Sequence, residues 1–325
     1  MCNVDTMVLF ATRHWNVLIV ASLTIWVYSK QPVWSVISFI LIAIKIFTNV
    51  DMWTRTYSRH VPLSKDDVAV VVGGARGLGI EMVKQLTNKY KVKKVIIIDM
   101  NKPEVRHQDI TFIPCNVGDK KKYAEVLQNV IDECEASGDK IRVFVTNAGI
   151  RHSKSVLQLS MEEIDEIYDV NVFSYIQGIR ALLKHHMKHP QDSLSIVTVS
   201  SVLGILAPRN LTIYSSTKAA LSQIHEGLAQ ELVDFPSIRM LLVLPGQLSR
   251  GMFDDVSPSR TFFAPVVDHI KLAKDIMDRV NNGQCGVLSE PIYGKLLPVV
   301  KCLPYSIIQL CRRFSQMDQK VRDNS

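Results

Sequence analysis

The chain has 325 residues, of which 47% are hydrophobic and 21% are charged, and its formal net charge is +7. The excess lies at the two ends, because residues 1–60 carry five Lys or Arg against two Asp or Glu, and residues 294–325 carry six against two. The rest of the chain has a net charge of zero, which argues against nucleic-acid binding by a folded domain. The basic ends indicate contact with an anionic membrane surface. The length suits one large α/β domain with additions at both ends.

Two apolar runs lie near the N-terminus, at about 15–29 and 33–48, and Lys30-Gln-Pro32 separates them. Each is shorter than the roughly 20 residues of an ordinary transmembrane helix. Two short spans, a hairpin in the membrane, and one span with an interfacial partner all remain open. Tryptophans, which favour the lipid interface, stand at or near the edges of the runs: Trp15, Trp26, Trp34 and Trp53.

We expect residues 1–60 to form a membrane anchor. A cleaved signal peptide is the first alternative, but no small-residue cleavage site follows the first run, and a second apolar run does. A buried pair of soluble helices is the second alternative, although little polar face is visible in either run.

Residues 68–100 have the pattern strand, glycine-rich turn, helix, strand. Val68–Val72 is an apolar run typical of a buried parallel strand. This strand is followed by a glycine-rich turn, Gly73-Gly-Ala-Arg-Gly-Leu-Gly79, at the start of a helix. Glycines at such a turn let the backbone come close to a pyrophosphate. The second strand, Val95–Ile98, ends in Asp99, where an acid can accept hydrogen bonds from a ribose hydroxyl. The pattern predicts a dinucleotide site, and a glycine-rich loop of another α/β protein is the alternative.

The rest of the middle region keeps alternating strands with helices. Further strands are predicted near 111–114, 141–146, 194–199, 238–244 and 285–289. This order predicts a Rossmann-type, doubly wound parallel sheet with helices on both faces. We therefore expect residues 61–290 to form a single α/β catalytic domain.

Tyr214 and Lys218 are four residues apart, which places them on one face of a helix, and Ser201 stands thirteen positions earlier. An ammonium beside a phenol lowers the phenol's pKa, so Tyr214 is a candidate general acid and base. A nearby Ser hydroxyl could hold the oxygen of a substrate carbonyl or alcohol. The spacing alone is weak, because Tyr90 and Lys94 share it without a Ser partner.

The C-terminal tail, residues 291–325, contains an apolar stretch at 296–311 that ends in Arg312-Arg313. Two prolines inside the stretch argue against one long helix. We expect the tail to dock on a membrane surface, and an apolar cover over the substrate pocket is the alternative.

Six cysteines show neither a disulfide framework nor metal spacing, which fits a reducing compartment. His185, His186 and His189 favour a solvated helix end over a metal site, and no metal is expected. Asn210 opens a glycosylation motif between Ser201 and Tyr214, where a glycan would crowd the active-site mouth; this favours a cytosolic catalytic domain.

Together these motifs resemble the short-chain dehydrogenases/reductases over about residues 66–290. The resemblance is carried by Gly73, Gly77, Gly79, Asn147-Ala-Gly149, Asn171, Ser201, Tyr214, Lys218 and Pro245-Gly246. It implies a NAD or NADP cofactor and a reaction on a CH–OH group. The implied cofactor-binding residues are Gly73, Arg76, Gly77, Leu78, Gly79, Asp99, Asn116, Val117, Asn147, Ala148, Gly149, Tyr214, Lys218, Pro245 and Gly246.

The implied catalytic residues are Asn171, Ser201, Tyr214 and Lys218. In that pattern Tyr214 transfers the proton, and Lys218 binds the nicotinamide ribose and tunes Tyr214. Ser201 orients the substrate oxygen, and Asn171 positions a water in a proton relay.

Three positions depart from the family pattern: Val72 and Asn116 replace a usual Thr and Asp, and Arg250 stands where a Thr often meets the nicotinamide carboxamide. Arg250 bears most on cofactor geometry. NAD is favoured over NADP because Asp99 would repel a 2′-phosphate, although Arg76 could pair with one.

The sequence thus predicts a membrane-bound, NAD(P)-dependent oxidoreductase that interconverts an alcohol and a ketone or aldehyde on a lipophilic substrate. The resemblance is to membrane and lipid-droplet members related to retinol and hydroxysteroid dehydrogenases, which implies lipid metabolism. The short paired apolar runs suit the endoplasmic reticulum or a lipid-droplet monolayer better than a thick plasma membrane. The alternatives are an anchored enzyme with a soluble carbonyl substrate and a non-catalytic dinucleotide-binding scaffold. Substrate identity, reaction direction, the number of membrane passes and assembly into a homo-oligomer stay open.

Overall fold

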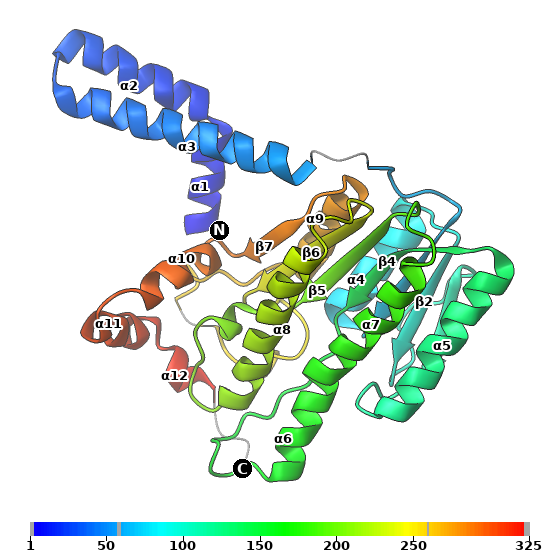
Figure 1. Ribbon diagram of the computed structural model, residues 1–325. Helices are drawn as coiled ribbons and strands as arrows, with labels where there is room; N and C mark the ends of the chain where they lie inside the picture. Colours follow the sequence, from blue (N-terminus) through cyan, green and yellow to red (C-terminus); the bar gives the residue numbers. More distant parts are fainter. Residues whose placement is uncertain (1–2, 57–59, 259, 322–325) are drawn as a thin grey trace.

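A seven-stranded parallel sheet forms the centre of the computed structural model, which describes residues 3–56, 60–258 and 260–321 (Figure 1). The strand order is β3-β2-β1-β4-β5-β6-β7, and every neighbouring pair is parallel. The strands are β1 (Asp67–Val72), β2 (Lys94–Asp99), β3 (Ile110–Pro114), β4 (Lys140–Thr146), β5 (Leu194–Val199), β6 (Ile238–Pro245) and β7 (Gly286–Glu290).

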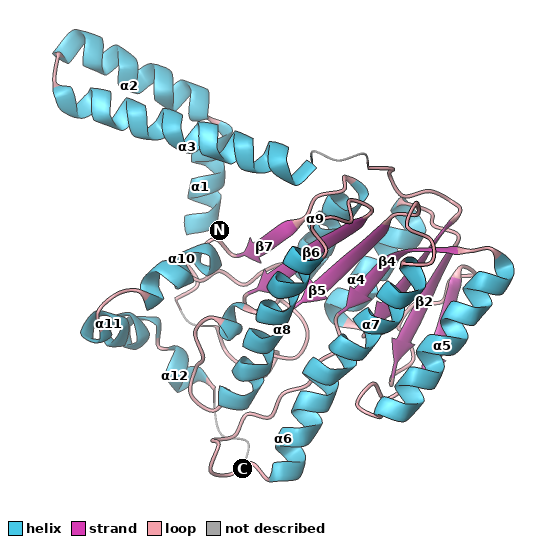
Figure 2. Ribbon diagram, in the orientation of Figure 1, coloured by secondary structure: helices cyan, strands magenta, loops and turns pink. Residues whose placement is uncertain are grey.

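Helices cover both faces of the sheet, which confirms the predicted Rossmann-type α/β fold (Figure 2). Alternate residues of β1 enter two separate apolar cores, so that Val70 packs with one helix layer and Val71 with the other. The first layer holds α5 (Lys120–Ser137), α7 (Ser174–His186) and α8 (Thr212–Glu231), and the second holds α4 (Gly77–Lys84) and α9 (His269–Asn281). Two π-helical segments, η1 (Gln85–Lys89) and η2 (Asp169–Phe173), continue α4 and α6 (Met161–Tyr168).

The strand order reverses between β1 and β4, so their connections leave the sheet on opposite sides. In open parallel sheets, ligands bind at the carboxyl ends of the strands at such a switch point. The glycine-rich turn after β1 and the Asn147–Gly149 turn after β4 both lie there. The topology therefore brings together the motifs that the sequence analysis singled out.

The N-terminal segment contains α1 (Val4–Arg13), α2 (Trp15–Ser29) and α3 (Pro32–Thr56). Helices α2 and α3 lie side by side and extend away from the α/β body (Figure 1). The buried Ser22 and Ser38 hydroxyls join them with a 2.8 Å hydrogen bond, and Lys45 hydrogen-bonds Asn16 across the pair.

Within the described part of the chain, no helix has both the length and the apolar character that crossing a membrane requires. Attachment to a membrane stays a prediction. The side chains of Trp53 and Arg55, and all of Arg59, which flank the second apolar run, lie outside the described residues.

The C-terminal tail folds into three short helices, α10 (Tyr293–Lys301), α11 (Tyr305–Ser315) and α12 (Met317–Lys320). Pro304 caps α11 at its N-terminal end, and Pro298 lies within α10, so the apolar stretch is divided as its prolines predicted. Helix α1 reaches the same region, because Asp5 accepts a hydrogen bond from the Ile292 N–H at 3.1 Å.

Candidate active site

The glycine-rich turn is held against the end of β4. Asn147 Nδ2 donates to the Gly73 carbonyl at 2.7 Å, and the N–H groups of Asn147 and Ala148 both donate to the Val72 carbonyl. Gly73 has φ +78°, and a Cβ there would lie 2.4 Å from the Ala148 nitrogen. A Cβ at Gly77 would meet no atom closer than 3.9 Å, so the turn leaves open space where a pyrophosphate would approach the start of α4.

The close approach at Gly73 predicts a large stability effect. Gly73→Ala should destabilise the protein by roughly 2 kcal/mol or more, because the new methyl group clashes with backbone and the conformation disfavours L side chains. The matched control is Gly227→Ala in the exposed part of α8, where a Cβ meets nothing within 4 Å. That variant should be stabilised by about 0.5–1 kcal/mol. Chemical denaturation of both variants tests the pair, and equal effects would contradict the stated packing.

Asp99 lies at the end of β2 beside the glycine-rich turn. Its carboxylate accepts hydrogen bonds from the Ala75 N–H and the Asn101 N–H, each at 3.0 Å. This holds the carboxylate at the sheet edge, with further lone pairs for a ribose hydroxyl. Arg76 is exposed immediately before α4, and Asn116 Oδ1 accepts from the Gly118 N–H at 3.0 Å.

Asn171 is almost fully buried in η2 and binds the backbone that follows β4. Its side chain accepts from the Ile150 N–H at 2.8 Å and donates to the Ile150 carbonyl at 3.0 Å. The amide also donates to Thr217 Oγ1 at 2.9 Å, next to Lys218 in α8. In this structure Asn171 ties the turn after β4 to the helix that carries Tyr214. The relay role implied for Asn171 stays a prediction.

Ser201 and Tyr214 are brought together although thirteen residues separate them. Ser201 follows β5 and accepts from the Leu203 N–H at 3.1 Å, while Tyr214 lies in the first turn of α8. Ser201 Oγ donates to the Pro245 carbonyl at 3.4 Å, both Ser201 and Tyr214 are buried, and the Ser201 hydroxyl is near enough to lower the pKa of Tyr214. The pair can therefore hold one substrate oxygen between two hydroxyl groups.

The predicted lowering of the Tyr214 pKa by Lys218 is wrong in this structure. Burial raises the pKa of Tyr214 above its ordinary value, and the Ser201 hydrogen bond and the Arg151 charge only partly offset this. Lys218 Nζ lies 5.8 Å from the Tyr214 ring centroid and donates to the Val199 carbonyl at 3.1 Å. Burial also lowers the pKa of Lys218, to about 8. Lys218 Nζ thus lies within cation–π range of the Tyr214 ring, and desolvation is the largest influence on the pKa of each group.

An apolar cavity of about 300 Å³ extends from Ser201 to the C-terminal tail, whose side chains form part of its wall. Most of its wall consists of hydrophobic side chains from the loops after β5 and β6 and from α10, α11 and the segment after them: Val202, Leu203, Leu206, Leu211, Phe253, Val256, Phe263, Leu297, Val300, Phe314 and Val321. We call this space the substrate cavity. The tail therefore adopts the arrangement that the sequence analysis gave as its alternative, and docking of the tail on a membrane stays a prediction.

Asn210 lies at the edge of this cover. Its Nδ2, the atom that would carry a glycan, donates to the Val321 carbonyl at 3.2 Å. Glycosylation would break this contact, which agrees with the expectation that a glycan would crowd the cavity.

A matching family model places these motifs in a known group, since the model described as short chain dehydrogenase matches residues 67–261. The chain belongs to the short-chain dehydrogenase family. It is an NAD(P)-dependent oxidoreductase, and the glycine-rich turn, Ser201, Tyr214 and Lys218 on this fold agree with that assignment.

Among curated relatives, the uncharacterized oxidoreductase TDA5 of Saccharomyces cerevisiae is 33% identical over 257 residues, which cover 78% of this chain and 77% of that protein. Cyclopentanol dehydrogenase of Comamonas testosteroni is 28% identical over 59% of this chain and 76% of its own length. A solved short chain dehydrogenase from Burkholderia cenocepacia, in complex with NADP, has a TM-score of 0.63 at 20% identity and covers 78% of this chain and 99% of that one. The resemblance to one group within the family, the retinol and hydroxysteroid dehydrogenases, stays a prediction.

Arg250, the most consequential departure from the family pattern, lies exposed after β6. Its guanidinium is 3.2 Å from the Glu104 carboxylate, in the loop after β2. This ion pair joins the two loops that flank the glycine-rich turn. No motif in the sequence indicates Glu104 as the partner of Arg250.

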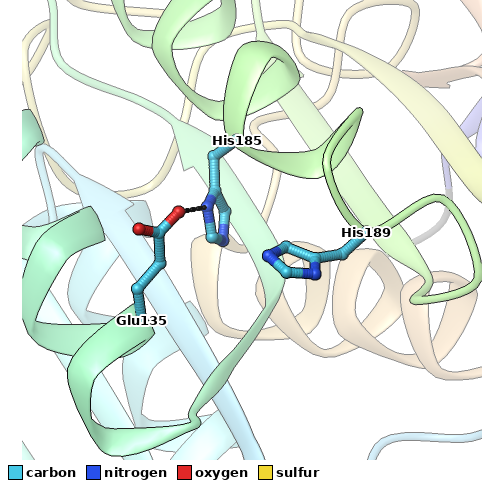
Figure 3. A group of neighbouring side chains, drawn as sticks. All are labelled: Glu135, His185 and His189. Atoms are coloured by element: carbon cyan, nitrogen blue, oxygen red, sulfur yellow. Dashed lines mark hydrogen bonds and ion pairs between the residues drawn. The ribbon is translucent and has the colours of Figure 1, made fainter.

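The histidines near the end of α7 form a small charged cluster away from this site (Figure 3). His185 Nδ1 lies 3.0 Å from Glu135 Oε1, and the His185 and His189 ring centroids are 5.5 Å apart. Lys188 Nζ lies 3.1 Å from the same Glu135 oxygen. The ammonium already supplies a positive partner to the carboxylate, so ion pairing accounts for the arrangement. The prediction that the chain holds no metal stays a prediction.

Proposed function

We propose that the protein interconverts a lipophilic alcohol and its ketone or aldehyde, with Tyr214 as the general acid and base. The observation that carries this proposal is the apolar wall of the substrate cavity, which leads from Ser201 to the tail. Pockets of this size bind small molecules mainly through apolar contact, with few polar groups to orient them. Here the Ser201 hydroxyl, which lines the cavity, and the neighbouring Tyr214 hydroxyl would be the orienting pair.

The bound cofactor would supply or accept the hydride, and the residues of the chain would bind, orient and move the proton. In the reducing direction Tyr214 donates its phenolic proton to the substrate oxygen, while Ser201 holds that oxygen by a hydrogen bond. The raised pKa of Tyr214 keeps the phenol protonated at neutral pH, as a proton donor requires. Lys218 would bind the nicotinamide ribose, and Asn171 would position a relay water.

A homologous series of secondary alkanols, from butanol to dodecanol, tests the substrate class. The apolar cavity predicts that kcat/KM rises with chain length, because each buried methylene contributes about 0.8 kcal/mol until the cavity is filled. Comparing cellular lipids with and without the protein, with Tyr214→Phe as the inactive control, identifies natural candidates. A clear preference for short, polar carbonyl compounds would instead favour the soluble-substrate alternative.

We further propose that NAD is preferred over NADP. Asp99 beside the glycine-rich turn would accept hydrogen bonds from a free ribose 2′-OH and would repel a 2′-phosphate. The exposed Arg76 would favour NADP instead, because its guanidinium could pair with that phosphate. Dissociation constants for both cofactors should favour NAD in the parent, and Asp99→Ala should narrow the difference. Arg76→Ala is the matched variant, since it should weaken NADP alone. A parent that prefers NADP would show that Arg76 dominates.

The helix pair α2 and α3 is our proposed membrane anchor. Helix α2 is apolar around its circumference, and side chains such as Val17, Val27 and Phe39 are more than 60% exposed. A helix that is apolar on all sides needs a hydrophobic environment. At about 1.5 Å per residue, the fifteen residues of α2 reach about 22 Å, less than the roughly 30 Å of a bilayer core. This length suits a hairpin in one leaflet, as at the endoplasmic reticulum or a lipid droplet.

The proposed topology has the catalytic domain in the cytosol. A tag placed after Ser325 should be digested by protease added to intact microsomes, and Asn210 should carry no glycan. Removal of residues 1–60 should release the protein from membranes. A protected tag would show the opposite topology, and a truncated protein that stays fully bound would move the anchor to the tail.

A further inference from the structure

Arg151 is a largely buried charged side chain next to Phe253, which lines the substrate cavity and contacts Tyr214. It follows the turn after β4, and its side chain is only 9% exposed. Burying a guanidinium costs free energy unless its donors are paired. The partners of Arg151 therefore indicate which segment its side chain holds in place.

The contacts of Arg151 are made with nearby backbone, carboxylate, hydroxyl and aromatic groups. Its Nε donates to the Met252 carbonyl at 2.9 Å, and its Nη2 forms an ion pair with the Asp255 carboxylate. Its guanidinium carbon lies 4.6 Å from the centroid of the Phe253 ring, within cation–π range. Nη1 also hydrogen-bonds the buried Ser153 hydroxyl. Three of these four partners belong to one loop.

That loop, residues 252–256, lies between β6 and α9, and we call it the substrate loop. Phe253 contacts Tyr214 edge to face, with ring centroids 5.7 Å apart. Gln247 secures the loop from the other side by donating to the carbonyls of Phe253 and Val256. Phe253 is therefore held between Arg151 and Tyr214, and it forms part of the cavity wall.

The backbone of Arg151 is equally well anchored. Asn171 hydrogen-bonds both the N–H and the carbonyl of Ile150, the residue immediately before it. Arg151 thus connects a residue of the implied catalytic set to the loop that covers the substrate cavity. A flexible surface arginine would have neither connection.

We propose that Arg151 is a positioning residue that holds the substrate loop closed and places Phe253 against Tyr214. The loop then completes the apolar wall next to the reacting oxygen and keeps water away from it. The substrate side of this inference rests on the proposed function, whereas the closure of the loop does not.

A second consequence follows from charge. The positive charge of Arg151 lowers the pKa of Tyr214 against the larger raising effect of burial. Lys218, on the same helix, lies 5.8 Å from the Tyr214 ring centroid, and Asp255 is paired with Arg151. Arg151 thus acts on the general acid and base from outside α8.

Arg151→Ala, Arg151→Lys and Asp255→Ala separate the two effects. With the best alkanol of the series above, Arg151→Ala should raise KM roughly tenfold and move the alkaline midpoint of the oxidation pH profile upward. Asp255→Ala opens the same loop but keeps the cation, so KM should rise while the midpoint does not move upward. Arg151→Lys should return the pH midpoint to the parental value, because the positive charge is kept. It should reverse only part of the increase in KM, because an ammonium lacks the planar, multiply hydrogen-bonding guanidinium.

Two measurements keep this test independent of turnover. Hydrogen exchange at residues 252–256 should speed up in Arg151→Ala and Asp255→Ala, while the cofactor dissociation constant should stay at the parental value. If the parent oxidises no alkanol, the proposed function fails. Hydrogen exchange still tests whether Arg151 holds the substrate loop in place. Parental loop protection together with parental KM and pH midpoint in Arg151→Ala would overturn the inference.

Discussion

Tyr214→Phe should lower kcat by roughly 10²–10⁴-fold, the range expected for loss of a positioned general acid. Only the phenolic oxygen is removed, so the remaining aromatic ring should keep its apolar contacts with Leu211, Phe253 and Val321. Cofactor binding should change little, because Lys218 and the glycine-rich turn are untouched. Single-turnover kinetics and cofactor titration on the same preparation separate the two effects.

The chain offers a matched control in its second Tyr–Lys pair. Tyr90 hydrogen-bonds the Asp278 carboxylate on α9, and Lys94 begins β2, where it lies 3.7 Å from Glu133. The shared spacing therefore does not bring Tyr90 and Lys94 together. Tyr90→Phe should cost only the stability of one hydrogen bond and leave kcat unchanged. Parental turnover in Tyr214→Phe would refute the catalytic assignment.

The strands could be predicted from the sequence because buried parallel strands have continuous apolar runs. Every predicted strand ends within one residue of the observed one, from β1 to β7. The position of the glycine-rich turn followed from the same reasoning, since a turn between a buried strand and a helix has few alternatives. These features depend on local sequence and on the topology of parallel sheets.

The parts that could not be predicted depend on contacts between segments far apart in the chain. No pattern in the sequence connects Arg151 with Asp255, or Asn210 with Val321, because each contact joins loops more than a hundred residues apart. The same holds for Phe314 and Val321 at the cavity, since an apolar tail suits a membrane as well as a pocket. Only the tertiary structure shows that the tail forms part of the cavity wall.

The error on the Tyr214 pKa has a related cause. Spacing gives the distance between two side chains along a helix, but it does not give their burial. Both Tyr214 and Lys218 are less than 5% exposed, and desolvation opposes the charged form of each.

Lys218→Met should abolish most turnover and at the same time stabilise the folded protein. A pKa lowered from 10.5 to about 8 corresponds to about 3 kcal/mol against folding at neutral pH, at about 1.36 kcal/mol per pKa unit. Methionine fills a similar volume without a charge. It forfeits the hydrogen bond to the Val199 carbonyl, so the net gain should be roughly 1–3 kcal/mol.

The pH dependence of the stability difference between Lys218→Met and the parent distinguishes loss of the buried charge from a change in packing. Below about pH 8 Lys218 is charged in both states, and the full cost of burying the charge applies. Between about pH 8 and pH 10.5 the unfolded chain binds the proton more strongly, so parental stability rises with pH in this window. The Met variant lacks this term, so its advantage over the parent should shrink from pH 7 to pH 9.5.

Denaturant unfolding of the cofactor-free protein at both pH values measures this difference. Lys184→Met, at an exposed site near the end of α7, is the matched control and should show no such pH trend. A Lys218→Met protein that is less stable than the parent at pH 7 would show that the buried ammonium stabilises the fold. The expected outcome, higher stability with lost turnover, would mean that the buried charge of Lys218 is retained for the reaction at a cost to the fold.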